Sequence, residues 1–208
     1  MITEITSGVY DLTVAEVNSG RYRVFLFDGE TPTLVDAGLP DTVDTIADRL
    51  DGIAIEPERL VITHGDPNHV GGLGGLAERY GLRTWVPEGL ETEGITPDHR
   101  YGHGDGIGRF VAVHTPGHTD EHHALIEVDG DVAVLGDAAF GADSRGLPKG
   151  YFVLPPGFFS ADLNEADASL ERLLQYEFGI GLVYHGSSVT DDASEKLRRF
   201  VEFAGRPK

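Results

Sequence analysis

Metal-binding side chains gather in one short stretch of the sequence, Thr63-His64-Gly65-Asp66-Pro67-Asn68-His69. Within six residues it offers three good metal ligands and one weaker donor: His64, Asp66, His69 and Asn68. Pro67 fixes the direction of the backbone and Gly65 permits a tight turn, so that one loop can direct several side chains at a single point. The stretch therefore predicts a site for a metal ion.

Three more potential ligands each stand just after a short apolar segment. They are His118, which follows Thr115-Pro116-Gly117, Asp137, which follows 132–136, and His185, which follows 182–184. His64 stands in the same setting, after the apolar segment 60–63. Functional side chains commonly lie at strand ends, on loops held by a rigid scaffold. We therefore expect these residues to meet at one rim of the fold and to bind metal there.

The donor types restrict the metal and indicate the reaction. The sequence contains no cysteine, so a metal must be held by nitrogen and oxygen. A divalent ion in such a site lowers the pKa of a bound water molecule to about 7 and polarises the carbonyl or phosphoryl group under attack. We predict one or two zinc ions, with iron or manganese as alternatives, and hydrolysis by attack of the hydroxide so formed.

Apolar patterns predict the strands and helices that carry these residues. Strands are expected at 9–17, 22–27, 33–35, 60–63, 83–86, 110–114, 124–128, 132–135 and 180–184. Helices are expected after Pro40, over 70–80, and after caps at Asn164 and Thr190. This order predicts an α/β fold with two sheets inside and helices outside, in a single domain over residues 1–208.

The overall charge restricts the partners of this chain. Its 208 residues include 35 Asp and Glu against 16 Lys and Arg, which gives a formal charge of −19. Such a surface repels nucleic acid and anionic membranes, so the expected substrate is a small molecule. Lysine occurs only at Lys149, Lys196 and Lys208, and this acid excess is typical of salt-adapted proteins such as those of halophilic archaea. The sequence shows neither a signal peptide nor a membrane span, so we expect a cytoplasmic protein.

Several other features have a plainer interpretation. The remaining histidines are interpreted as surface or hydrogen-bonded residues: His99, His103, His114, His122 and His123. Asp36 is expected to hold the metal loop by hydrogen bonds. The glycines at 71–75 lack the Lys-Ser/Thr of a phosphate-binding loop and are expected to pack closely against the metal loop. The aromatic residues of the Gly- and Pro-rich segment 141–160 are expected to form a substrate wall or lid, or else a core or homodimer contact.

Taken together, the motifs resemble those of the metallo-β-lactamase superfamily. That family has a His-x-His-x-Asp-His loop after a strand, then a Pro-Gly-His-Thr stretch, a Gly-Asp stretch and a final His after a last strand. The matching residues here are His64, His69, Pro116-Gly117-His118-Thr119, Gly136-Asp137 and His185-Gly186, preceded by the similar early strand motif Leu34-Val35-Asp36-Ala37-Gly38. The resemblance covers about residues 24 to 187 and implies a four-layer αββα sandwich.

Two positions differ from the family pattern: Asp66 stands where a second His is usual, and Asn68 where a metal-binding Asp is usual. The resemblance implies one metal site with His64, Asp66 and His118, and another with His69 and His185, with Asp137 bridging the two. An amide oxygen binds a divalent ion more weakly than a carboxylate, so the second ion is expected to bind less tightly or to be absent. Asp66, Asp137 and Asn68 are the expected catalytic residues.

The chain is similar in size to the compact glyoxalase II and lactonase-like members of the family. The resemblance implies hydrolysis of a small ester-like substrate, namely a thioester, a lactone or a related acyl compound. Two alternatives stay open. An iron-dependent oxidoreductase acting on a sulfur compound or oxygen is favoured by Asp66, because a carboxylate suits a harder ion than a third His does. A catalytically degraded binding module is favoured only by Asn68.

Overall fold

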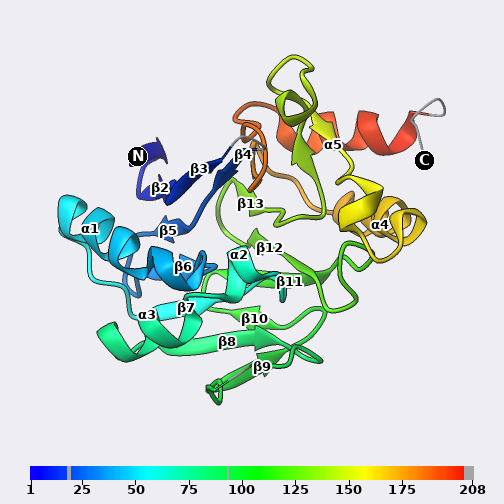
Figure 1. Cartoon of the computed structure of the whole chain (residues 1–208). Helices are drawn as coiled ribbons and strands as arrows, with labels where there is room; N and C mark the ends of the chain where they lie inside the picture. Colours follow the sequence, from blue (N-terminus) through cyan, green and yellow to red (C-terminus); the bar gives the residue numbers. More distant parts are fainter. Residues whose placement is uncertain (18–19, 93, 204–208) are drawn as a thin grey trace. The chain divides into compact units, whose positions relative to one another are not determined.

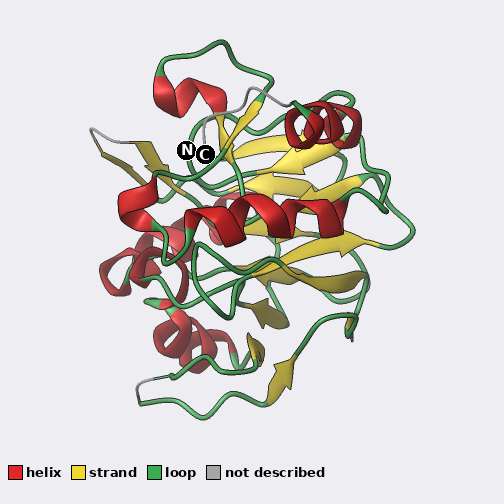
Figure 2. Ribbon diagram, turned by 90° about the vertical axis from the view of Figure 1, so that its right-hand side faces the viewer, coloured by secondary structure: helices red, strands yellow, loops and turns green. Residues whose placement is uncertain are grey.

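The protein contains two compact units, Met1–Tyr101 and Gly102–Lys208, each with its own main sheet and helices (Figure 1). The computed structural model describes residues 1–17, 20–92 and 94–203. Short strands and helices are joined by many loops (Figure 2). The prediction of an α/β fold is confirmed, with two main sheets and two additional two-stranded ones in the described residues. Within the described residues no helix combines the length and the apolar character needed to cross a membrane.

The first unit is built on a seven-stranded sheet with the order β1-β2-β5-β6-β7-β8-β9. Its strands are β1 (Thr3–Thr6), β2 (Val9–Asp11), β5 (Phe25–Phe27), β6 (Thr33–Val35), β7 (Arg59–Val61), β8 (Arg83–Pro87) and β9 (His99–Tyr101). Pairing is antiparallel from β1 to β6 and parallel from β6 to β9. Two further strands, β3 (Ala15–Val17) and β4 (Gly20–Tyr22), pair with each other.

Helices α1 (Val43–Ile53) and α3 (Leu73–Tyr80) supply the helical side of the first core. The buried side chains of Ile46 and Leu50 on α1, and of Leu73 and Leu76 on α3, belong to one apolar cluster with strand residues such as Leu60. The apolar spacing after Pro40 thus predicted α1 and its buried face correctly. A one-turn 3₁₀ helix, η1 (Pro40–Thr42), precedes α1.

The predicted helix over 70–80 is wrong in its continuity. The chain forms a short helix α2 (Pro67–Val70), then Gly71 and Gly72, then α3. A Cβ atom at Gly72 would collide with the carbonyl oxygen of Ala37, and one at Gly71 would collide with Pro40. The predicted close packing against the metal loop is confirmed at Gly71, where a Cβ atom would also collide with the carbonyl oxygen of Pro67. It is wrong at Gly72, which packs against Ala37, and at Gly74, where a Cβ atom would have open space.

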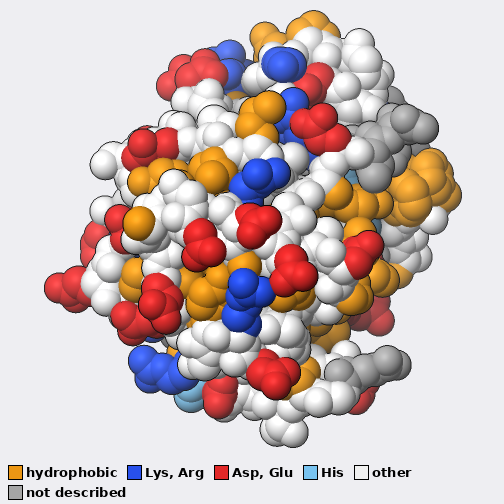
Figure 3. All heavy atoms as spheres, turned by 60° about the vertical axis from the view of Figure 1, so that its left-hand side comes forward, with side chains coloured by type: hydrophobic (Ala, Val, Ile, Leu, Met, Phe, Trp, Pro, Cys, Tyr) orange, Lys and Arg blue, Asp and Glu red, His pale blue; other side chains and the backbone are white. Residues whose placement is uncertain are grey.

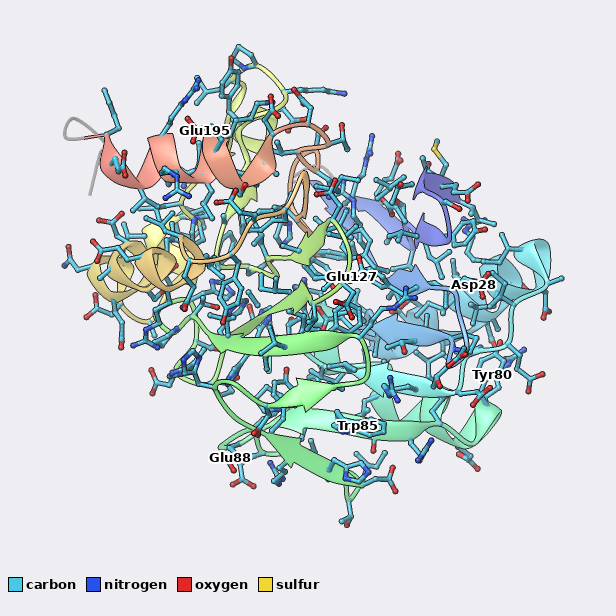
Figure 4. All side chains as sticks on the ribbon, turned by 180° about the vertical axis from the view of Figure 1, so that it is seen from behind. Asp28, Tyr80, Trp85, Glu88, Glu127 and Glu195 are labelled. Atoms are coloured by element: carbon cyan, nitrogen blue, oxygen red, sulfur yellow. The ribbon has the colours of Figure 1, made fainter. Side chains whose placement is uncertain are left out.

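The only tryptophan in the sequence, Trp85, belongs to the first unit (Figure 4). Its ring stacks on that of His99 with centroids 4.4 Å apart, and the guanidinium carbon of Arg59 lies 4.9 Å from the ring centroid. Trp85 therefore provides a fluorescence probe of the folding of this unit.

Asp and Glu side chains are spread over the face drawn in Figure 3 rather than gathered in one patch.

The second unit is built on a five-stranded sheet with the order β10-β11-β12-β13-β16. Its strands are β10 (Gly106–Ile107), β11 (Phe110–His114), β12 (His123–Glu127), β13 (Val132–Val134) and β16 (Ile180–Leu182). Pairing is antiparallel except between β13 and β16, which are parallel. The expected strands include none between 88 and 108, where the structure has β9 and β10.

The remaining elements of the second unit are short, and two predicted caps are wrong. They are β14 (Phe140–Gly141), η2 (Ala142–Arg145), β15 (Phe152–Val153), η3 (Gly157–Phe159), α4 (Leu163–Ser169), η4 (Leu170–Leu173) and α5 (Ala193–Glu202). The cap of α4 is Asp162, not Asn164, because its carboxylate accepts hydrogen bonds from the amides of residues 164 and 165. α5 starts after Asp192, not Thr190, and Asp192 makes no side-chain cap.

Candidate metal centre

The first group of predicted metal residues lies just beyond the carboxyl end of β7. Strands β6 and β7 are parallel, with Val35 opposite Val61, so the residues that follow them emerge at the same edge of the sheet. The amide of Asp36 continues the ladder by donating to the carbonyl of Val61 at 2.8 Å. As a result, Asp36 lies next to the loop that begins at Thr63 and carries the metal residues.

Asp36 is the anchor of this loop. Its side chain is fully buried, and one carboxylate oxygen, Oδ1, accepts a hydrogen bond from the Thr63 amide at 2.7 Å. The other oxygen, Oδ2, accepts from the Thr63 hydroxyl at 2.8 Å and lies 2.7 Å from Nδ1 of His69. Asp36 has a φ of 63°, a conformation that Asp tolerates better than most residues. The expectation that Asp36 holds the loop by hydrogen bonds is confirmed.

These contacts fix the tautomers of both histidines. The carboxylate can only accept, so Nδ1 of His69 carries the proton and donates it to Asp36. The Thr63 hydroxyl donates its proton to Asp36 and must therefore accept from Nδ1 of His64, 3.0 Å away. Both imidazoles consequently present the lone pair of Nε2, the nitrogen that a metal would bind. Their ring centroids lie 4.0 Å apart.

Asp66 and Asn68 complete the first group. An oxygen of the Asp66 carboxylate, Oδ2, lies 3.8 Å from Nε2 of His64, and the Asp66 side chain is 38% exposed. Asp66 directly precedes α2, in which Pro67 is the first residue and Asn68 is half-buried. The structure therefore places Asp66 and His69 close to His64, and their role as metal ligands stays a prediction.

The second group consists of His118, Asp137 and His185 in the second unit. His118 follows β11, Asp137 follows β13 and His185 follows β16. One buried oxygen, Oδ2 of Asp137, lies 3.5 Å from Nε2 of His118 and 3.3 Å from Nε2 of His185. Three residues separated by up to 67 positions in the sequence thus converge within this unit.

The His118 loop is held by the start of α4. Gly117 has a φ of 121°, and a Cβ atom there would collide with the backbone of Ala166. The amide of Asp162 donates to the Gly117 carbonyl at 2.9 Å, and that of Ala161 donates to the His118 carbonyl at 3.0 Å. Only glycine fits at position 117, which explains the Pro-Gly-His order of this motif.

The His185 turn is held by Asp143. The Asp143 carboxylate accepts hydrogen bonds from both the amide and the hydroxyl of Ser187, each at 2.7 Å. Burial by itself would raise the pKa of Asp143, but these hydrogen bonds outweigh burial and keep the pKa below its ordinary value. The Phe140 ring packs against the His185 ring with centroids 4.5 Å apart. Sequence patterns did not single out Asp143 or Ser187.

Of the histidines not predicted to bind metal, His122 contacts the second group. Its Nε2 accepts a hydrogen bond from the amide of Asp137 at 2.9 Å, and its Nδ1 lies 2.8 Å from the Thr115 hydroxyl. His123 is also buried, and its Nδ1 donates to the carbonyl of Glu121 at 2.8 Å. Burial lowers the pKa of His123 to about 4. Both are hydrogen-bonded residues, as expected, although sequence reasoning missed the contact between His122 and Asp137.

The donor atoms suit a divalent ion. Zinc bound at about 2.0–2.1 Å in tetrahedral geometry places its ligand atoms about 3.4 Å apart. The separations of 3.3 and 3.5 Å in the second group match this spacing, and the 3.8 Å between His64 and Asp66 is somewhat larger. Neutral imidazoles and carboxylates are the ligands that zinc, iron and manganese share. The chain therefore contains groups of His and Asp side chains that could hold a metal ion.

Comparison with known proteins identifies the family. Residues 14–199, which include both groups, match the profile of the Metallo-beta-lactamase superfamily. The chain belongs to this superfamily. A metallo-beta-lactamase from Pontibacter korlensis has the same fold, with a TM-score of 0.75, 17% sequence identity and coverage of 97% of this chain and 96% of that one.

Two relatives with hydrolase names are similar over different lengths. The hydroxyacylglutathione hydrolase of Xylella fastidiosa (strain M12) is 35% identical over 89 residues, which are 40% of this chain and only 33% of that enzyme. The probable metallo-hydrolase YflN of Bacillus subtilis (strain 168) is 25% identical, over 90% of this chain and 87% of that protein. The chain thus matches about a third of the length of the first relative and most of the second.

Proposed function

We propose that this member of the superfamily is a metal-dependent hydrolase that cleaves a small thioester, lactone or related acyl compound. The observation that carries the proposal is the convergence of two imidazole nitrogens, from His118 and His185, on one buried oxygen of Asp137. Superfamily membership and relatives with hydrolase names support it. So does the atrochrysone carboxyl ACP thioesterase of Aspergillus fumigatus, which is 25% identical over 88% of this chain.

In this proposal the two groups hold metal together. His64, Asp66 and His118 would hold one ion, His69 and His185 would hold a second, and Asp137 would contribute to both, as the family resemblance implies. The match to the family profile supports a metal centre that uses both groups, because the matched residues 14–199 include both of them. A bound divalent ion would supply a Lewis acid and would lower the pKa of a water molecule bound to it to about 7.

The residues of the chain have distinct tasks around that chemistry. Asp137 is 2% exposed, so its task is to hold and space the metal ligands rather than to exchange protons with solvent. Asp66 is part-exposed, so the oxygen that does not bind metal can accept a hydrogen bond from the attacking water and orient it. Asn68 contributes an amide, which can orient a water molecule but is a poor base. Because an amide oxygen is also a weaker metal ligand than a carboxylate, the second metal is expected to bind more weakly than the first.

The acidic surface adds a condition to the assay. The formal charge of −19 supports adaptation to high salt, where screening relieves the repulsion among carboxylates. Activity should therefore be measured in molar salt as well as in dilute buffer. Small neutral or weakly charged acyl substrates suit this surface better than polyanions.

The test combines elemental analysis of natively purified protein with a substrate panel of a glutathione thioester, a lactone and a phosphodiester. The proposal predicts bound zinc, iron or manganese, acyl hydrolysis that is lost with a chelator and restored by the metal, and little phosphodiesterase activity. Protein that binds metal but only oxidises a thiol or reduces oxygen would support the oxidoreductase alternative. Protein without metal affinity or hydrolysis would contradict the proposal.

A further inference from the structure

His122 lies between the strand ends that lead to two predicted ligands of the second unit, His118 and Asp137. In the sheet, β12 lies between β11 and β13 (Figure 1). His122 immediately precedes β12, Thr115 immediately follows β11, and Asp137 lies three residues beyond β13. One side chain at the start of the middle strand can therefore contact the ends of both neighbouring strands.

The hydrogen bonds of His122 define a single protonation state. The Asp137 amide is a donor, so Nε2 of His122 accepts and carries no proton. The proton is then on Nδ1, which donates to the Thr115 hydroxyl at 2.8 Å. The Thr115 amide in turn donates to the His122 carbonyl at 2.8 Å. The side chain is fully buried, so it is committed to these contacts and is not itself placed to be a ligand.

We propose that His122 is a positioning residue that sets the orientation of Asp137 relative to His118. It holds the Asp137 amide through Nε2 and the start of the 115–118 loop through Nδ1, while the Asp137 oxygen lies 3.5 Å from the His118 nitrogen. This inference rests on the proposed function, in which Asp137 and His118 bind metal. Groups that orient metal ligands in this way typically change metal affinity by about 10–100-fold when they are removed.

The two ring nitrogens can be tested separately. A glutamine side chain places its oxygen near the position of Nε2, so His122→Gln keeps an acceptor for the Asp137 amide. An asparagine side chain reaches only the position of Nδ1, so His122→Asn keeps the contact with Thr115 and loses the one with Asp137. His122→Phe removes both contacts and keeps the ring volume. Thr115→Val removes the partner of Nδ1 with little change in shape.

The experiment measures the dissociation constant for Zn²⁺ alone, by competition with a chromophoric chelator, and the unfolding free energy of each metal-free protein. We expect zinc binding about 10–100-fold weaker in H122N and H122F than in the wild type, and about tenfold tighter in H122Q than in H122N. A purely structural role would lower the unfolding free energy of H122Q and H122N alike and leave their zinc constants equal. That result would overturn the inference.

Two controls separate this inference from the proposed function. The proposed function requires that Asp137→Asn weakens zinc binding. If the wild-type protein binds no zinc, or binds it with the same affinity as D137N, both the proposed function and the inference are refuted. If wild type binds zinc and D137N does not, unchanged binding in H122N would refute the inference alone. Should the His122 variants fail to fold, T115V carries the test, with zinc binding weakened about threefold to tenfold as the supporting result and unchanged binding as the opposing one.

Discussion

The two units hold their metal-binding residues by different means. In the first unit, one buried carboxylate, Asp36, receives hydrogen bonds from the loop backbone, from a threonine and from a histidine of the group. In the second unit, the residues come from three loops, each held separately: by the start of α4, by His122 and by Asp143. The first arrangement is concentrated in one side chain, and the second is distributed over the fold.

This difference determines how many ligands a single substitution should displace in each unit. A change at Asp36 should disturb His64 and His69 together, because both Nδ1 protons lead to the same carboxylate. A change at one support in the second unit should disturb one ligand and leave the others in place. Four predictions test the supports and ligands of the two units, from the largest expected effect to the smallest, and the third of them compares the two arrangements directly.

The largest effect is expected at Asp137, a buried carboxylate that faces the imidazoles of His118 and His185. Replacing it by asparagine keeps the shape and removes the charge that holds the ligands together. We expect Asp137→Asn to lower kcat/KM for the best acyl substrate by about a thousandfold or more. Asp129→Asn, at an exposed turn of the same unit, is the matched control and should be neutral. Activity within about tenfold of wild type would show that Asp137 is not a ligand.

The second prediction concerns His123, a buried residue of the second unit that lies outside the metal group. Its pKa of about 4 is below the ordinary 6.5, so the unfolded state binds more protons between these values. The stability that neutral His123 preserves is therefore complete above pH 6.5 and lost as the pH falls to 4, by about 3 kcal/mol in total. Denaturant unfolding at several pH values, followed by circular dichroism, measures this loss. His123→Asn should flatten the profile over this range, and a slope equal to that of wild type would rule out the assignment.

The third prediction tests the concentrated arrangement. Asp36→Asn keeps the shape and tolerates the φ of 63°, but its amide nitrogen cannot accept a hydrogen bond. We expect the dissociation constant for the metal to rise about 10–100-fold. We expect the free energy of unfolding to fall by about 1–3 kcal/mol. Trp85 fluorescence follows the unfolding of this unit. Ser187→Ala, which removes one of two hydrogen bonds to Asp143, is the counterpart in the second unit and should cost less. Equal losses in both variants would contradict the contrast between the units.

The smallest expected effect is a gain. Asn68→Asp restores a carboxylate where the family pattern has one, and a carboxylate binds a divalent ion more tightly than an amide does. We expect the weaker metal equivalent to bind about tenfold more tightly, while the tighter equivalent changes little. Competition titration with two chelators of different affinity resolves the two equivalents. Asn68→Ser is the control, and a gain of the same size in that variant would mean that charge at this position is irrelevant.

Sequence patterns identified the groups better than their supports. The stretch 63–69 was readable because its potential ligands are contiguous, and Asp36 was readable because it ends a strand. His122 and Asp143 were missed because their contacts depend on the pairing of β11 with β12 and on the turn at Ser187, which no local pattern encodes. The helix over 70–80 was wrong at Gly71 and Gly72 because tertiary contact with residues 37 and 40 overrides the local periodicity. The cap at Asp162 was missed because Asn164, two residues later, is an equally suitable capping residue.

The proposed function requires that His64 and His118 would hold the same ion, and a double-variant cycle tests this proposal most directly. Metal affinity is measured by chelator competition for wild type, His64→Asn, His118→Asn and the double variant. If the two histidines share one ion, either single change removes the tighter equivalent and the double variant loses little more. Losses that add fully, with each change removing a different equivalent, would contradict the shared centre.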